Sequence, residues 1–174
     1  SCSDFLDRYP LDELSDSSFW KTENDAMMAV TDIYGCLPTW DQDEDINSDN
    51  AVHGIKWAAG NISKGIYDPM DQSWAGSYTP IRQCNLVLEK VKDIEMSDES
   101  RKKIEGQAYF FRAFVYFNLI RSFGDVPYID KPLNLTDVED ITRTPREEVY
   151  AKVMADFDKA IEYLPEEWDA ANTP

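Results

Sequence analysis

Four segments of the chain repeat apolar residues at helical spacing, and the first of them begins near residue 22. Thr22, followed three residues later by Asp25, is a variant of the capping box that starts helices. Pro38 ends the segment. Phe19 and Trp20 come just before it, and we expect them to fold back against this helix as a short apolar turn. The apolar row of this helix is predicted to be Ala26, Val30, Ile33, Tyr34 and Leu37.

The second helical segment runs from about Trp74 to Val91 and carries a proline in its interior. Pro80 is expected to break or kink the helix, so that Thr79 acts as the N-cap of a second piece. Asn85 falls in the apolar row, where a buried amide needs hydrogen-bond partners, and we interpret it as structural. The row consists of Trp74, Tyr78, Ile81, Asn85 and Leu88.

The third segment is the most apolar part of the chain. Ser97 is predicted to cap a long helix that ends at the turn Gly124–Pro127. Its aromatic residues cannot share one stripe of a helix, so we expect it to be packed on several sides at the centre of a helical stack. Gly106 weakens such a helix unless a neighbouring backbone comes close, and Arg112 is interpreted as an ion-pair or carbonyl partner. The predicted buried row is Ile104, Ala108, Phe111, Val115 and Leu119, and the other aromatic residues are Tyr109, Phe110, Phe114, Tyr116 and Phe117.

The fourth helix follows an extended stretch over residues 124–143. Thr144, Pro145 and Glu147 supply an N-cap, a first-turn proline and a capping-box acid. The buried row is predicted to be Val149, Val153, Phe157, Ala160 and Leu164.

Residues 38–73 show no sustained period and are rich in Asp, Asn and Gly. A loop of this length inside a compact domain is usually functional or disordered, and its aromatic residues argue against disorder. A sugar ring offers an apolar C–H face that stacks on Trp or Tyr and hydroxyls that pair with amides. We therefore select Trp40, Trp57, Asn61 and Tyr67 as candidate ligand-binding residues. The alternative for each tryptophan is that it only covers the helical stack, which is how we interpret Trp74 and Trp168.

Composition and charge exclude several functions. With 34 acidic residues against 17 Lys and Arg, the net charge of −17 repels a nucleic-acid backbone. No stretch is apolar over the roughly 20 residues that span a bilayer. The only imidazole is His53, so the sequence offers no nucleophile–base pair, no zinc site and no cofactor motif. We predict that the protein is not an enzyme.

An acidic run in the same loop is interpreted as a solvated surface. Its carboxylates are neighbours in sequence, whereas a glycosidase needs two that are desolvated and held at a defined separation. The run also lacks the glycine and the glutamate of an EF-hand, although looser calcium coordination stays open. It consists of Asp43, Glu44, Asp45, Asn47 and Asp49.

The two cysteines in helical segments, Cys36 and Cys84, are interpreted as small buried apolar residues. A disulfide between them is left open by the sequence.

Two short patterns match parts of a tetratricopeptide repeat: Gly106-x-x-Tyr109 fits a first half, and Phe157-x-x-Ala160 with Pro165 fits a second. A single helix pair cannot bury both its faces, so we expect the chain to be a fragment of a longer stack.

Several short sequence motifs match those of one protein family in their residues and in their order along the chain. They are Cys2–Asp7, Phe19–Glu23, Tyr78-x-x-Ile81-x-x-Cys84-Asn85, and Gln107–Ala113 running into Phe123–Pro127. Together they resemble the N-terminal part of SusD/RagB-type outer-membrane lipoproteins. The resemblance implies an all-α fold of TPR-like stacked helix pairs (a SusD-like α-superhelical scaffold), truncated and with a long irregular loop. Residues 1–21 would be a lipoprotein tether and N-terminal segment, and residues 22–174 the N-terminal helical domain.

The resemblance also implies a function at the outer membrane. Such a protein captures oligosaccharide at the cell surface and delivers it to a SusC-like TonB-dependent transporter. Ser1-Cys2 looks like the end of a lipobox, with Cys2 lipidated as the only membrane anchor and Ser3-Asp4 as a surface-export signal. Three alternatives remain: a peptide-binding member of the family, a TPR-type protein-interaction adaptor, and a glycosidase whose carboxylates lie partly outside this chain.

Overall fold

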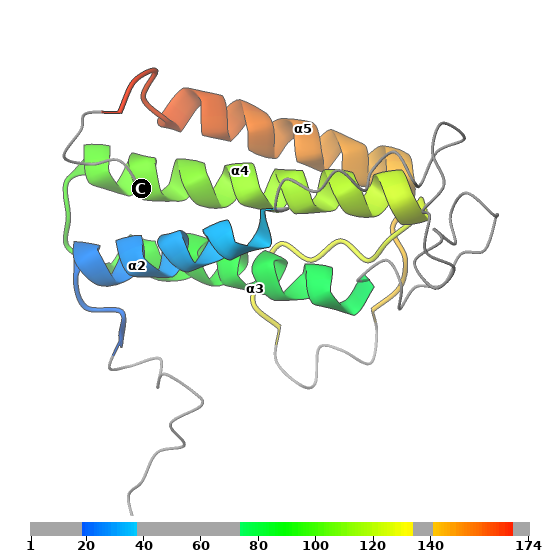
Figure 1. Cartoon of the computed structure of the whole chain (residues 1–174), viewed down its shortest axis with the longest axis horizontal. Helices are drawn as coiled ribbons and strands as arrows, with labels where there is room; N and C mark the ends of the chain where they lie inside the picture. The colour runs from blue at the N-terminus through cyan, green and yellow to red at the C-terminus, as the bar shows by residue number, and fades with distance from the viewer. Residues whose placement is uncertain (1–18, 38–73, 134–140, 169–174) are drawn as a thin grey trace, which may run out of the picture.

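The computed structural model describes residues 19–37, 74–133 and 141–168 (Figure 1). The regular secondary structure of these residues is helical. In chain order the elements are α2 (Glu23–Ile33), the 3-10 turn η1 (Tyr34–Cys36), α3 (Trp74–Lys90), the 3-10 turn η4 (Val91–Asp93), α4 (Asp98–Phe123) and α5 (Arg146–Tyr163). Within these ranges the β pairing consists of one isolated antiparallel bridge between Val126 and Thr144. The all-α prediction is confirmed.

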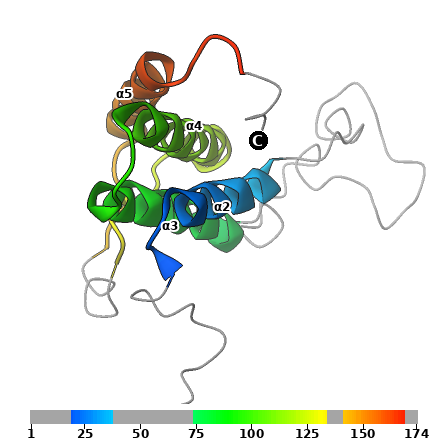
Figure 2. The ribbon, with the colours of Figure 1, turned by 90° about the vertical axis from the view of Figure 1, so that its left-hand side faces the viewer.

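Helix α4 lies at the centre of the arrangement. It packs on α5 along one side and on α3 and α2 along the other, as the end-on view shows (Figure 2). The row predicted to be buried, Ile104, Ala108, Phe111, Val115 and Leu119, is buried throughout. Tyr116 and Ala113 on other sides of the same helix are fully buried as well. A helix that is apolar nearly all round is therefore covered on several sides, as the sequence predicted.

The start of α2 follows the local capping signal. The Thr22 hydroxyl accepts a hydrogen bond from the Asp25 amide at 3.3 Å, and the Asp25 carboxylate accepts one from the Thr22 amide at 2.8 Å. Trp20 packs against the adjacent core cluster, as expected. The prediction for Leu37 was wrong, because this side chain is 40% exposed. After Ile33 the chain tightens into η1 and then extends, so the helical spacing no longer carries Leu37 to the buried side.

Helix α3 runs without interruption through Pro80, so the predicted second start at Thr79 was wrong. Proline in the second turn removes one backbone hydrogen bond, and burial of the following apolar row against α4 and α2 holds the helix together.

The start of α5 also differs from the prediction. Thr144 does not cap the helix, because its backbone pairs with Val126 and its hydroxyl accepts a hydrogen bond from the Tyr128 amide at 3.4 Å. Pro145 occupies the N-cap position, without a side-chain cap. The amide of Arg146 instead donates to the Asp125 carboxylate at 2.9 Å. The turn after α4 thus caps α5 and fixes the two helices side by side and antiparallel (Figure 1).

Gly106 of α4 lies against the end of α5. A Cβ atom at this position would lie 2.9 Å from Leu164 Cγ and 3.1 Å from Tyr163 Cβ. The predicted close neighbour is therefore present, although it consists of side chains and not of backbone.

Replacing Gly106 with alanine is expected to lower the free energy of unfolding by about 1 kcal/mol. Alanine gains about 1 kcal/mol of helix propensity, but overpacking against α5 costs about 1–3 kcal/mol. Urea denaturation followed by circular dichroism measures the difference. Gly35→Ala is the matched control, because nothing lies within 4 Å of a Cβ atom there. A stabilised Gly106→Ala variant would contradict the close packing.

Candidate functional site

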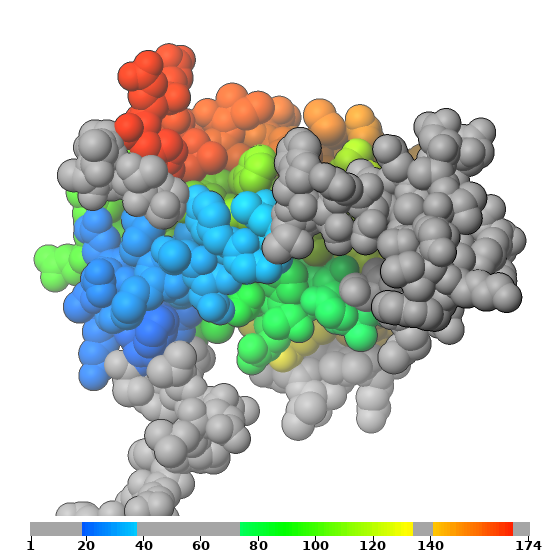
Figure 3. All heavy atoms as spheres, in the orientation of Figure 1, coloured from blue at the N-terminus to red at the C-terminus, as the bar shows by residue number. Residues whose placement is uncertain are grey.

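An open pocket of about 640 Å³ lies where the end of α2, the first half of α3 and the last half of α4 meet. Figure 3 shows the end of α2 in light blue beside the green surface of α3. Gly35 and Cys36 line the pocket from one side, and Gly76 and Ser77 from another. The lining therefore comes close in sequence to Leu37 and Trp74, the described residues on either side of the segment 38–73. The other described lining residues are Asp32, Thr79, Pro80, Gln83, Phe114, Val115, Asn118, Arg121 and Ser122.

The polar groups of the pocket come from all three helices. The Gln83 amide donates to the Asp32 carboxylate at 2.8 Å and links α3 to α2. The Asn118 amide donates to the Phe114 carbonyl at 3.0 Å. Each of these two amides keeps a side-chain oxygen that accepts no hydrogen bond from the described residues. Together with the hydroxyls of Thr79 and Ser122, these amides offer both donors and acceptors to a ligand.

One aromatic ring accompanies these polar groups. Phe114 is half-buried, and its ring lies nearly parallel to that of Phe110, with centroids 6.3 Å apart. A few convergent polar groups beside an apolar wall are typical of a ligand pocket. Asp32 is the only carboxylate among the described lining residues, so this part of the site holds no carboxylate pair for glycoside hydrolysis.

The residues selected from sequence lie outside the described residues. This holds for Trp40, Trp57, Asn61 and Tyr67, and for the lipidation candidate Cys2. Trp74 is described, and it packs edge-on against Phe123 with ring centroids 4.8 Å apart. The Arg143 guanidinium lies 5.0 Å from its ring centroid. These contacts agree with the structural interpretation of Trp74.

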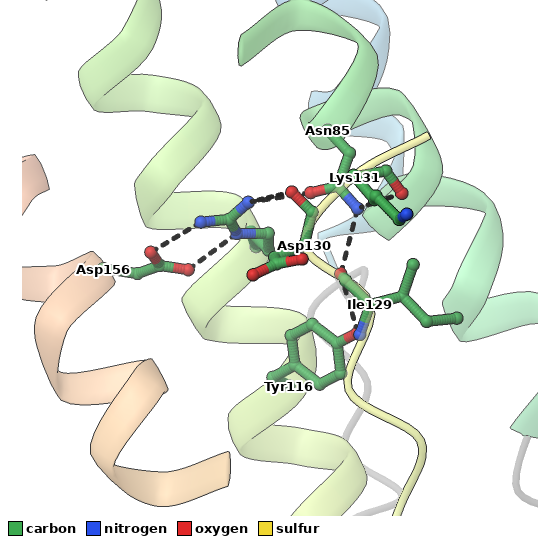
Figure 4. Close-up of polar contacts among 7 residues, drawn as sticks. Asn85, Tyr116, Ile129, Asp130, Lys131 and Asp156 are labelled. Carbon is green, nitrogen blue, oxygen red and sulfur yellow. Dashed lines mark hydrogen bonds and ion pairs between the residues drawn. The ribbon is translucent and has the colours of Figure 1, made fainter. Parts of the chain in front are cut away.

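A buried polar network lies on the other side of α4 (Figure 4). The Arg112 guanidinium donates twice to the Asp156 carboxylate, at 2.7 Å each, and ties α4 to α5. It also donates to the Asn85 side-chain oxygen at 2.8 Å, which ties in α3. Burial opposes the charge on Arg112, but the hydrogen bonds and charge of Asp156 outweigh it and hold the pKa of Arg112 above its usual value. The sequence interpretations of Arg112 and Asn85 are confirmed.

The same network fixes the extended segment after α4. Asn85 donates to the Ile129 carbonyl at 2.9 Å. The Tyr116 hydroxyl accepts from the Ile129 amide at 2.7 Å and lies 3.1 Å from its carbonyl oxygen. Tyr78 donates to the Pro127 carbonyl at 3.0 Å. Each of these groups makes a hydrogen bond within the fold. We therefore interpret the network as structural support that holds the helices in place, and not as a ligand-binding site.

Alkaline pH is expected to destabilise this core. Burial raises the pKa of the Cys84 thiol from 9.0 to about 12 and that of the Tyr78 hydroxyl from 10.0 to about 12. The folded chain holds these protons more tightly than the unfolded chain. Their contribution is therefore complete below about pH 9 and is lost as the pH rises toward about 12. The urea midpoint should be lower at about pH 11 than at about pH 8, and Tyr78→Phe should reduce the fall. An unchanged midpoint in the native chain would contradict the burial of these groups.

The cysteine interpretation is only partly confirmed. Cys84 is buried, whereas Cys36 is half-buried and lines the pocket, and both are free thiols.

No helix in the described ranges is long and apolar enough to cross a membrane. Across residues 19–37, 74–133 and 141–168, no three His, Cys, Asp or Glu side chains gather as a metal-binding group.

Comparison with known protein families shows to which family the chain belongs. A family model described as starch-binding and associating with the outer membrane matches residues 4–174. The chain belongs to the SusD-like family. The resemblance seen in the sequence is therefore confirmed.

Individual SusD-like proteins agree with this assignment. SusD-like protein P2 of Formosa agariphila is 30% identical over 180 residues, which cover 95% of this chain and 35% of that protein. The crystal structure of a SusD-like protein from Bacteroides fragilis is 26% identical, with a TM-score of 0.79 over 95% of this chain and 34% of that one. A laminarin-binding SusD-like protein shares the fold at 23% identity, with a TM-score of 0.76 over 87% of this chain and 36% of that one. The chain thus spans about a third of the length of the relatives it matches.

Sequence reasoning did not select the helical wall of this candidate pocket. Asp32, Gln83 and Asn118 lie on predicted helices, whereas the ligand-binding residues were predicted in the segment without helical period. One signal was present: Asp32 lies just before that segment and Gln83 not far after it, on helices whose ends the segment connects.

Proposed function

We propose that this chain is part of a cell-surface protein that captures oligosaccharide and delivers it to a SusC-like TonB-dependent transporter. Two findings on related proteins support the ligand class. The family model is described as starch-binding, and one protein of the same fold is described as laminarin-binding. The family description also places such proteins at the outer membrane. In this proposal a lipid on Cys2 anchors the protein, and residues 1–21 form the tether.

The observation that carries the proposal is the position of the pocket. Cys36 and Gly76, which line it, lie close in sequence to the two ends of the segment with Trp40, Trp57, Asn61 and Tyr67. We propose that these four residues and the pocket form one site. Trp and Tyr rings would stack on the C–H face of the sugar, and the amides of Gln83 and Asn118 would pair with its hydroxyls. The protein binds and releases its ligand without breaking a bond.

Calorimetric titration of the full-length protein with a panel of oligosaccharides and oligopeptides tests this proposal. We expect saturable binding of at least one oligosaccharide. Asn118→Ala should weaken that binding by about tenfold, which corresponds to the loss of one good hydrogen bond. Glu148→Gln is the matched control, because this exposed residue of α5 does not line the pocket.

Other outcomes reassign the protein. Binding of peptides alone would place it with peptide-binding members of the family. Oligosaccharide binding that is unchanged in Asn118→Ala would exclude the helical wall from the site.

A further inference from the structure

The hydrogen-bonding groups of the pocket are weighted toward acceptors. The Asp32 carboxylate accepts the Gln83 amide through Oδ2, and its Oδ1 accepts no hydrogen bond from the described residues. The side-chain oxygens of Gln83 and Asn118 accept none from these residues either, and both side chains make their described contacts through the amide nitrogen. These three oxygens come from α2, α3 and α4 and line one pocket. A ligand that displaces water from them has to supply hydrogen-bond donors.

Asp32 and Arg121 are the charged residues of the described lining, and they differ in how they are engaged. No ion pair within the described ranges includes Asp32, so its contact with the neutral Gln83 amide leaves the negative charge in place. The Arg121 side chain is already engaged with another residue of the chain. The Asp32 carboxylate is therefore the charge that we expect a ligand to meet.

This combination of acceptors and negative charge distinguishes between classes of sugar. The hydroxyls of a neutral sugar donate hydrogen bonds, and hydrogen bonds to a charged acceptor are among the strong ones. The carboxylate of a uronic acid and the sulfate of a sulfated sugar only accept, and both are negative at neutral pH. Two like charges about 4 Å apart repel enough to weaken binding about fivefold even at the dielectric constant of water, and more in a partly enclosed site.

We propose that Asp32 makes this pocket selective for neutral oligosaccharides over those that carry carboxylate or sulfate groups. The proposal rests on the proposed function, because it requires that the pocket binds sugar. Gln83 acts as a positioning residue, since its amide holds the carboxylate across the junction of α2 and α3 at 2.8 Å. The net charge of −17 acts in the same direction, but salt screens it beyond about 8 Å at physiological ionic strength, so the nearby carboxylate dominates.

Calorimetric titration of the full-length protein with matched pairs of ligands tests the selectivity. The probes are neutral hexasaccharides of glucose, mannose and galactose, and the same hexasaccharides oxidised to the carboxylate at C6. The readout is the ratio of the two dissociation constants within each pair. In the native protein we expect at least one neutral hexasaccharide to bind, and its oxidised counterpart to bind about tenfold more weakly or worse.

Three variants assign the ratio to the pocket. Asp32→Asn removes the charge at nearly constant shape and should narrow the ratio about fivefold. Asn118→Asp places a second carboxylate in the lining and should widen it by a similar factor. Glu89→Gln is the matched control, because this exposed residue of α3 does not line the pocket and its change removes the same charge as Asp32→Asn. Its ratio should equal that of the native protein. A variant that merely unfolds would lose both ligands together.

The outcomes separate this inference from the function on which it rests. Oxidised hexasaccharides that bind as tightly as the neutral ones, or more tightly, would overturn the selectivity and leave oligosaccharide capture intact. An unchanged ratio in Asp32→Asn would overturn the role of Asp32. The absence of binding to every hexasaccharide would overturn the proposed function, and the selectivity with it.

Discussion

Replacing Asp156 with alanine is expected to lower the free energy of unfolding by about 3–5 kcal/mol, which is the usual cost of leaving a buried charge without its partner. Arg112 and Asp156 are each only 6% exposed, and two hydrogen bonds of 2.7 Å join them. Without the carboxylate, the described contacts of the Arg112 charge are the Asn85 side-chain oxygen at 2.8 Å, the Asp130 carbonyl at 3.5 Å and the Tyr109 ring, whose centroid lies 5.4 Å away, and none of them carries a negative charge. Urea denaturation of the two chains measures the difference.

An exposed ion pair provides the matched control. Lys159 and Glu162 approach to 2.8 Å on the surface of α5, so Glu162→Ala should cost less than about 1 kcal/mol. Replacing both buried partners, as Arg112→Met with Asp156→Leu, should give a chain more stable than Asp156→Ala, because no charge is then left unpaired. Equal effects of Asp156→Ala and Glu162→Ala would contradict the role of the buried pair.

Replacing Phe111 with alanine is expected to cost about 3–5 kcal/mol, the range found when a large aromatic side chain is removed from a core. Phe111 is 2% exposed and packs edge-on against Tyr34, with ring centroids 4.6 Å apart. The residue before it, Phe110, is chemically identical and 38% exposed. Phe110→Ala in the 174-residue chain should therefore cost much less.

This pair of neighbours tests the orientation of α4 directly. Thermal unfolding of both variants under the same conditions gives the comparison. If Phe110→Ala destabilised the 174-residue chain as much as Phe111→Ala, the assignment of Phe110 to an uncovered face would be wrong.

The helices and the central place of α4 could be predicted from the sequence, because their signals are local. The cap at Thr22 is satisfied by Asp25, three residues away. The same reasoning failed at Thr144, where Val126 and Asp125 from the preceding turn supply the contacts. At Pro80, burial of the following row outweighs the helix-breaking tendency of the proline. Local rules thus fail where a tertiary contact competes with them.

The candidate site could be predicted much less completely. The pocket is built from the ends of three helices, and the sequence does not show that Asp32 and Gln83, 51 residues apart, meet. Likewise, Arg112 could be recognised as needing a partner, but nothing local identifies Asp156, 44 residues further along. The link between the residues selected in the segment 38–73 and the pocket is the sequence proximity of Cys36 and Gly76, which line the pocket, to the two ends of that segment.

Tryptophan-fluorescence titration of the full-length protein with oligosaccharides tests the central claim most directly. The native protein, Trp57→Ala and Trp40→Ala are compared, with oligopeptides as the second ligand class. We predict saturable oligosaccharide binding that is lost in at least one of the two variants. Binding of equal strength in all three proteins would contradict the proposed site, and the absence of any response to oligosaccharides would contradict the proposed ligand.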